Sequence, residues 1–141
     1  MTADAGHGAV ALAVALRDAH FRLKGLARAW EEGALAGPTC GCESLGPVWQ
    51  YSDRPDEATY TDGQAIGLAG NLTVILELSI GFSHAGTDML AGVSVEDDGG
   101  NVAELLSTGP EEFPATTADL VTAIDRCLDS MERLDVADAI R

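Results

Sequence analysis

Apolar residues recur at helical spacing near the start of the chain. From residue 12 to residue 30 they step by four or three positions, which places them along one line of a helix. This seam consists of Leu12, Leu16, Ala19, Leu23, Leu26 and Trp30. The pattern predicts a helix that starts at Ala9 and ends at Gly33 or Gly37, after a mobile leader over residues 1–8.

The first half of this helix is apolar on a second side as well. Val10, Val14 and Phe21 lie about 180° from the seam if each residue turns the helix by 100°. One layer of a domain cannot cover both sides of a helix, so other parts of the chain, a second copy or a foreign partner must cover this side. We expect these three residues to form a partner or homodimer surface.

Strict alternation of apolar residues marks a central strand further along. Its inward positions are Leu72, Val74, Leu76, Leu78, Ile80 and Phe82. Ile66 shares this core face if it pairs with Val74, which leaves a short loop in which Asn71 takes a positive φ. The pattern therefore predicts an antiparallel hairpin with one buried face.

The next inward set predicts a further hairpin. It consists of Met89, Ala91, Val93 and Val95. A loop around residues 85–86 would place Phe82 opposite Met89, so that core residues of the two strands meet in pairs. Asp98 and Gly99 then predict a type I′ turn.

That turn would set Val95 against Val102 and start a last strand, which runs to about Leu106. Residues 37–63 are predicted as an irregular connection with one strand over residues 48–51 and a second short strand around residues 58–61. After the sheet, Thr116 or Thr117 can cap a final helix. Its apolar seam consists of Leu120, Ile124, Cys127, Met131 and Leu134.

Together these elements predict one α+β domain over residues 9–141. Four to five antiparallel strands form the sheet, and the N-terminal and C-terminal helices pack on one of its faces. The expected order is α-β-β-β-β-β-α, in which the first strand has the shortest pattern.

Charge is distributed unevenly along the chain, whose formal net charge is −15. Residues 1–42 hold four acids and four bases, whereas residues 43–112 hold thirteen acids and one base, Arg54. Such a surface repels phosphate, which argues against nucleic acid and anionic membranes and favours a basic protein partner. In the first helix, Asp18 and Arg22 are spaced to form an ion pair. Its back side carries the one basic cluster, made of Arg17, Lys24 and Arg28.

Targeting and redox signals favour the cytoplasm. The longest apolar stretch, residues 8–16, is closed by Arg17 and Asp18 and is far shorter than the roughly 20 residues of a bilayer span. The chain has three cysteines, and their spacing matches no known pattern of disulfide pairs. This favours a reducing compartment over an oxidising one, in which disulfides would stabilise the fold.

Cys40 and Cys42 are the one cluster of soft metal ligands. Structural zinc sites usually combine two cysteine pairs, and here a single C-x-C stands without a second pair. Two ordinary loop thiols are therefore the favoured interpretation, with a metal site or redox pair as the alternative. No cofactor is expected.

His84 is the one histidine with chemistry-bearing neighbours, which are Ser79, Ser83 and Asp88. Turn residues of these types usually serve hydrogen bonding and solubility. No catalytic residue is assigned on this basis.

Glu77 lies in the middle of the central strand on the side away from the apolar core. The predicted pairing sets it opposite Ser94. This side is either a solvated sheet face or a shallow binding surface, since antiparallel sheets commonly leave one face wet. The binding surface would consist of Thr73, Ile75, Glu77, Ser79, Ser94 and Glu96.

These features favour a non-enzymatic interaction protein that binds a protein partner and forms a homodimer. Trp49, Tyr51 and Tyr60 would serve as aromatic anchors. The outline is shared by toxin-neutralising immunity proteins and acidic secretion chaperones, an analogy at the level of fold class alone. The alternative is a small-molecule or metal-binding protein, or an enzyme, with a pocket near Cys40, Cys42, Trp49 and His84.

Overall fold

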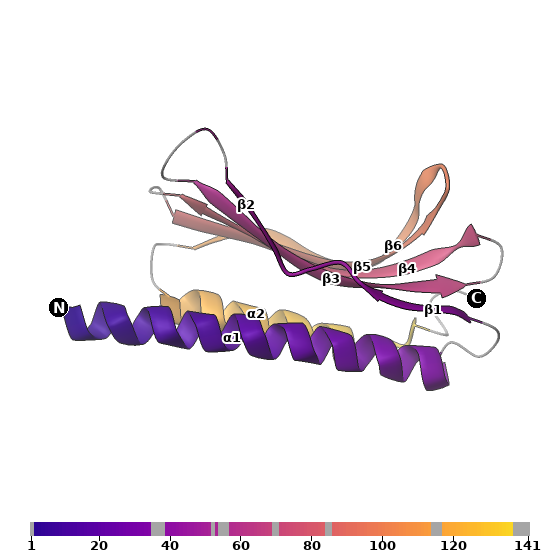
Figure 1. The fold of residues 1–141 in the computed structure, drawn as a ribbon, viewed down its shortest axis with the longest axis horizontal. Coiled ribbons are helices and arrows are strands. Elements are labelled where there is room, and N and C mark those ends of the chain that lie inside the picture. The colour runs from indigo at the N-terminus through magenta and orange to yellow at the C-terminus, as the bar shows by residue number, and fades with distance from the viewer. Residues whose placement is uncertain are drawn as a thin grey trace.

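Two helices cover one face of a six-stranded antiparallel sheet (Figure 1). The computed structural model describes residues 2–34, 39–51, 53, 57–68, 71–83, 86–113 and 117–136. Helix α1 spans Thr2–Ala29 and continues into a π-helical turn at Trp30–Ala34, and helix α2 spans Thr117–Arg133. The α+β class and the order of helix, strands and helix are confirmed.

The strands follow one another mostly as hairpins. Their bounds are β1 Thr39–Ser44, β2 Val48–Tyr51, β3 Ala58–Leu68, β4 Thr73–Ser83, β5 Gly86–Asp97 and β6 Gly100–Phe113. The sheet has the order β1-β3-β4-β5-β6, and β2 also pairs with β3. β1 and β2 therefore share one edge of the sheet.

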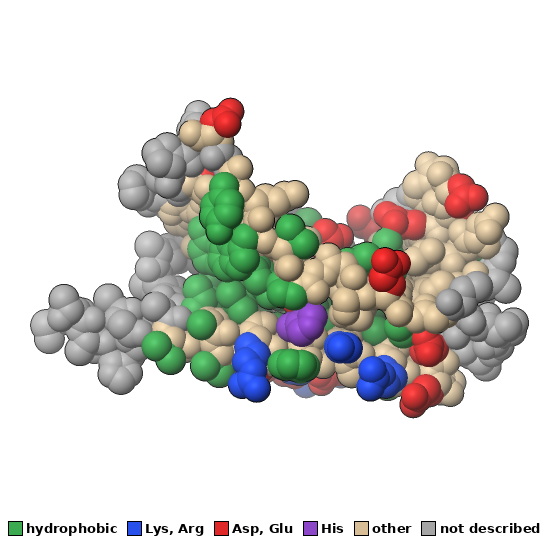
Figure 2. Space-filling model, viewed as in Figure 1, with side chains coloured by type: hydrophobic (Ala, Val, Ile, Leu, Met, Phe, Trp, Pro, Cys, Tyr) green, Lys and Arg blue, Asp and Glu red, His purple; other side chains and the backbone are tan. Residues whose placement is uncertain are grey.

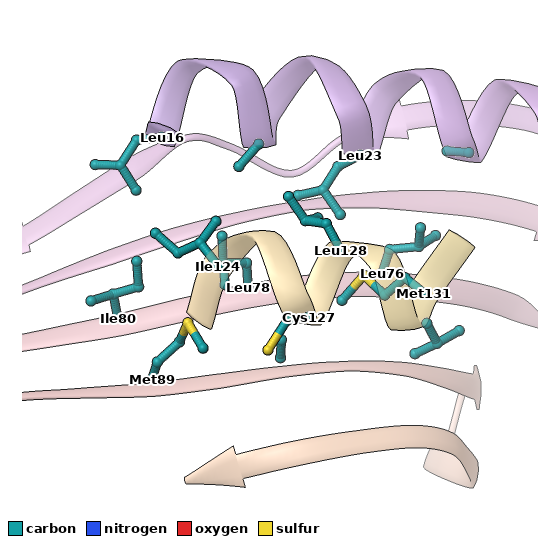
Figure 3. Packing of buried hydrophobic residues seen from close by; sticks show 14 of the residues in the cluster. Leu16, Leu23, Leu76, Leu78, Ile80, Met89, Ile124, Cys127, Leu128 and Met131 are labelled. Atoms are coloured by element: carbon teal, nitrogen blue, oxygen red, sulfur yellow. The ribbon is translucent and has the colours of Figure 1, made fainter. Parts of the chain in front are cut away.

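The core lies between the helix layer and the sheet. Figure 3 shows side chains of α1 and α2 pointing at the strands β4 and β5. The labelled residues are Leu16, Leu23, Leu76, Leu78, Ile80, Met89, Ile124, Cys127, Leu128 and Met131. Both predicted helix seams face this core, because apolar stripes of helices are stable only when buried.

The hairpin of β3 and β4 has the predicted register. Ile66 pairs with Val74, and the Leu68 backbone nitrogen donates to the Leu72 carbonyl at 2.8 Å. Asn71 has a φ of 61°, the left-handed conformation expected there.

The register predicted for β4 and β5 is wrong by two residues. Phe82 lies opposite Thr87, and Met89 lies opposite Ile80. The connection is shorter than predicted, because Ser83 already pairs with Gly86. A slip of two keeps every side chain on its face of the sheet, so the core set is unchanged.

The last hairpin also departs from the prediction. Positive φ occurs at Gly100 (121°), whereas a type I′ turn would need it at both Asp98 and Gly99. The Asp97 side chain accepts a hydrogen bond from the Gly99 nitrogen at 2.8 Å, which stabilises the turn in another form. A bulge next to Val95 then brings Ala103 opposite that residue in place of Val102.

Four element bounds were mispredicted. The last strand, β6, ends at Phe113 and not at about Leu106. α1 begins at Thr2, so the helix includes residues 2–8, whose predicted mobility stays a prediction. β3 is one strand of 11 residues where two separate ones were expected. β1 was predicted as part of a loop; Gly41–Ser44 are exposed, and an edge strand without a buried side leaves no alternating pattern.

Arg22 of α1 forms ion pairs with α2. Its guanidinium donates to Asp125 at 2.7 Å, to Asp129 at 2.8 Å and to Glu132 at 3.0 Å. The predicted pair of Arg22 with Asp18 is therefore replaced by contacts between the two helices. Three carboxylates within two turns of one helix would repel each other without this cation.

We predict that Arg22→Ala lowers the free energy of unfolding by about 1–2 kcal/mol, since a network of charged hydrogen bonds exceeds one exposed pair. Urea denaturation measures this. Lys24→Ala, on the outer side of the same helix, is the control and should change stability by less than about 0.5 kcal/mol. Equal effects of the two substitutions would contradict the role of Arg22.

Candidate functional site

A carboxylate is buried in the middle of β3. Asp62 is 0% exposed, and its oxygens lie 3.0 and 3.2 Å from Nδ1 of His20 on α1. It also accepts a hydrogen bond from the Gly63 nitrogen at 2.8 Å. Burial, followed by the charge and hydrogen bonding of Asp62, raises the pKa of Tyr60 to about 12. These contacts offset the cost of placing a carboxylate in the core.

The buried polar row continues along the same strand. Gln64 is 2% exposed, and its Nε2 donates to the Ser44 hydroxyl at 2.8 Å. Tyr60, Asp62 and Gln64 are alternate residues, so they share the helix-facing side of β3 with Ile66. This row was missed in the sequence, although extending the period of two backwards from Ile66 would have found it.

An aromatic cluster packs against Tyr60, the first residue of this row. The ring of Trp49 lies 5.0 Å from Tyr60 in an edge-on arrangement, and 5.7 Å from Phe82, stacked at 29°. Tyr60 lies beside Asp62, whose carboxylate also contacts His20 on α1, so the cluster and α1 meet at one buried group. Trp49 is thus packed against two rings of its own chain.

The outer side of α1 carries a second group of exposed side chains. The Phe21 ring lies 5.4 Å from the His20 ring, and the Arg17 guanidinium lies 5.7 Å from the centre of Phe21. Phe21 is 56% exposed, Val10 is 65% exposed and Val14 is 48% exposed. The structure thus leaves uncovered the side of the helix that the sequence marked as apolar.

Large hydrophobic side chains are also exposed along the edge strand β2 and just before it. We name this group the aromatic edge, and it consists of Leu45, Val48, Trp49 and Tyr51. Trp49 is 45% exposed and Tyr51 is 80% exposed. Figure 2 shows hydrophobic side chains gathered over β2, and their surface continues down to α1.

Charge separates the two layers. Among the side chains that the structure describes from residue 41 to residue 108, every charged one is acidic, and the described bases all lie on α1 or α2. On the open sheet face, exposed Glu77 borders a shallow hollow of about 160 Å³ together with Glu96 and Glu104. Glu77 lies opposite Gly92 and not opposite Ser94, because of the two-residue slip between β4 and β5.

The surroundings of Cys42 disfavour its thiolate form. The residue as a whole is exposed, but its sulfur points at the Ala27 carbonyl of α1, 3.6 Å away. Burial of this sulfur, followed by hydrogen bonding and charge from Glu31, raises the pKa of the thiol to about 11. Metal ligation and nucleophilic attack both need the thiolate, which this environment disfavours.

Little can be described of the other residues of the predicted metal or enzyme site. The side chain of Cys40 and all of His84 lie outside the described residues. Cys127 lies on α2 and is buried in the core, where its sulfur is 3.3 Å from the Thr108 hydroxyl oxygen. Within the described part of the chain, no three or more His, Cys, Asp or Glu side chains are grouped so that they could hold a metal ion.

Comparison of this chain with models of protein families, with curated proteins and with solved structures finds no match. None of the helices in the described ranges is long and apolar enough to cross a membrane.

We predict that Asp62→Ala destabilises the fold by about 2–4 kcal/mol, because it removes the partner of the part-buried His20 ring and leaves a cavity and an unpaired Gly63 nitrogen in β3. Chemical denaturation with urea measures the loss. Asp88→Ala, at an exposed position of β5, is the control and should stay within about 0.5 kcal/mol of the wild type. A loss below about 1 kcal/mol for Asp62→Ala would show that the contact between Asp62 and His20 does not stabilise the fold.

A second prediction concerns Cys42 in a Cys40→Ser background. Its iodoacetamide reaction at pH 8 should be at least about tenfold slower than that of a thiol with the ordinary pKa. A pKa raised from 9.0 to about 11 lowers the thiolate fraction roughly 100-fold, and the greater nucleophilicity of the more basic thiolate recovers part of that rate. The pH dependence of the rate, read by mass spectrometry of the Cys42 peptide, gives the pKa directly. Glu31→Gln should lower that pKa, because it removes a negative charge. A wild-type midpoint below pH 9 would contradict the described environment.

Proposed function

We propose that this protein acts by binding another protein at its aromatic edge, without catalysing a reaction. The observation that carries the proposal is the exposure of Trp49 and Tyr51 on the edge strand β2, where the ring of Trp49 also packs against the buried Tyr60. Tryptophan and tyrosine dominate the energetic centres of protein interfaces, because they bury much surface for few rotatable bonds.

Rigidity strengthens this proposal. Trp49 already stacks on Phe82 and touches Tyr60, so binding would not need to order its ring. Side chains held in place before association lose little entropy when the partner arrives. An aromatic side chain left exposed by accident would lack such support from two other rings.

The charge of the chain indicates the kind of partner. A net charge of −15, concentrated on the sheet, attracts a basic protein over distances beyond contact. Immunity-like neutralisation of a basic toxin and chaperone-like binding of a basic secreted protein both fit this description. The analogy with those classes rests on fold class and acidity alone.

The alternative, a small-molecule, metal-binding or catalytic pocket near Cys40, Cys42, Trp49 and His84, has less support. The raised pKa of Cys42 disfavours the thiolate that such chemistry requires. Trp49, its other described member, is engaged in the aromatic edge.

Affinity purification of the tagged protein from its native host, in low salt, tests the proposal. We expect a basic protein to be retained in stoichiometric amount and to be lost above about 0.5 M salt, where charges are screened. The double variant Trp49→Ala, Tyr51→Ala should reduce retention at least about tenfold.

Val102→Ala provides the matched control, because Val102 is 56% exposed but lies on β6, at the other end of the sheet order. It should retain the partner like the wild type. Recovery of no stoichiometric protein at any salt, or equal retention by the double variant, would refute the proposal.

A further inference from the structure

The edge strands of the sheet differ in how their open side is protected. β1 and β2 form one edge, and β6 forms the other (Figure 1). An edge strand presents unpaired backbone N–H and C=O groups that can pair with another chain, and natural proteins blunt such edges with charged residues, bulges or proline. Within its bounds, β2 contains none of these three.

The other two edge strands are protected in this way. The pairing of β1 with β3 is interrupted between Thr39 and Gly41, and β1 carries Glu43. The pairing of β6 with β5 is interrupted at three places, and β6 contains Glu104 and Pro110. A bulge twists the edge away, and a charge would have to be desolvated, so both oppose pairing with a further strand.

β2 has an unbroken and uncharged edge. Its four residues, Val48–Tyr51, pair in continuous register with β3, and all of them are exposed. In an antiparallel pair, alternate residues turn their N–H and C=O groups toward the partner strand, and the residues between them turn these groups away. Two residues of β2 therefore direct backbone groups outward, and within the described part of the chain no hydrogen bond reaches them.

We propose that an extended, basic segment of the partner protein adds to β2 as a further strand of the sheet. This inference rests on the proposed binding at the aromatic edge and specifies its form. The backbone of the segment pairs with the outward groups of β2, which is a recurring mode of peptide recognition. Because β2 is only four residues long, these bonds are few, and side chains on both sides of the added strand have to contribute.

On the side that faces the helices, the added strand meets aromatic rings. Trp49 lies on this side because it pairs with Tyr60, and Tyr51 lies two residues further on the same side. Neighbouring strands place side chains of one face about 5 Å apart. Figure 2 shows hydrophobic side chains over β2 at the surface. Apolar residues at alternate positions of the segment therefore pack beside both rings.

On the opposite, open side of the sheet, the added strand meets carboxylates. Gln50 lies on this side next to Thr59, which lines a hollow of about 280 Å³ together with Glu57 and Asp88. Two strand spacings, about 10 Å in total, separate the added strand from β3. A Lys or Arg side chain of the segment and the Glu57 side chain span this distance together. The positions between the apolar residues are therefore basic.

Charge also excludes a second copy as the favoured occupant of β2. Among the described side chains from residue 41 to residue 108, every charged one is acidic, so the same edge of another copy supplies no base. Two chains of charge −15 also repel each other. A basic segment of a different protein meets neither obstacle.

A synthetic peptide of about eight residues, in which valine and lysine alternate, tests the inference on the full chain at physiological salt. Fluorescence anisotropy of the labelled peptide measures binding. We expect it to bind at least about tenfold more tightly than a peptide with all valines before all lysines, which has the same charge but no apolar and basic side. Glutamate in place of lysine should abolish binding, because it opposes acid to acid.

Methylation of the amide nitrogens of the peptide is the matched control. In a strand added to one edge, the N–H groups of alternate residues face β2, and the others face solvent. Methylating all valine amides and methylating all lysine amides should therefore have unequal effects. One of the two should weaken binding at least about tenfold, and the other should change it less than about twofold. Equal effects would overturn the inference.

Amide hydrogen exchange, followed by NMR, detects the same contact on the protein. Two of the four β2 amides, alternate in sequence, should exchange at least about tenfold more slowly with the peptide bound, whereas amides of β6 should not change. Protection that appears in the free protein as its concentration rises would mean that a second copy occupies β2. That result would overturn the basic segment as the occupant.

The same measurement on the complex with a partner retained from the host separates this inference from the proposed function. A partner held by Trp49 and Tyr51 while the β2 amides exchange as in the free protein would overturn strand addition and leave partner binding intact. Recovery of no partner would refute the proposed function. Peptide binding with the expected inequality between the two methylations would then still establish β2 as a strand acceptor.

Discussion

Burial of one carboxylate constrains how the helix layer meets the sheet. Asp62 has no exposed surface, and a charge there is tolerated only while its partners stay within hydrogen-bonding distance. His20 comes from α1. Tyr60 comes from β3, the strand that also holds Asp62, and its ring contacts the ring of Trp49. One buried group therefore joins α1 to β3 and lies beside Tyr60, whose ring contacts Trp49.

The sequence predicts the apolar part of this architecture well, because alternation and helical spacing report directly which side is buried. It predicts register only in part. Ile66 and Val74 were paired correctly because Asn71, which tolerates a positive φ, marks the turn between their strands, whereas Phe82 and Met89 were not paired correctly. A slip of two residues leaves the buried side unchanged, so a pattern of burial cannot detect it.

The candidate site shows a different limit. Phe21, Trp49 and Tyr51 were identified from residue type and position, and they are exposed in the structure. The buried pair of His20 and Asp62 was missed, since polar residues at inward positions look like loop residues until the strand is known to continue through them. Cys42 was placed in a loop because an edge strand has no buried side to mark it.

The separation of charge between layers organises the surfaces of the molecule. The described charges on the strands are all acidic, whereas the helices carry acids together with all the described bases. The electrostatic potential is therefore most negative over the sheet.

The contact between Arg22 and α2 joins residues more than 100 positions apart, with the whole sheet between them in the chain. During synthesis, α1 leaves the ribosome before any strand, and α2 follows the last one. The hairpins can form early because their contacts are local, but the part of the sheet's apolar face that α2 covers stays exposed until α2 is made. Until then the nascent chain exposes the seam of α1 as well as its outer side, which makes the interval before α2 emerges the stage most prone to aggregation.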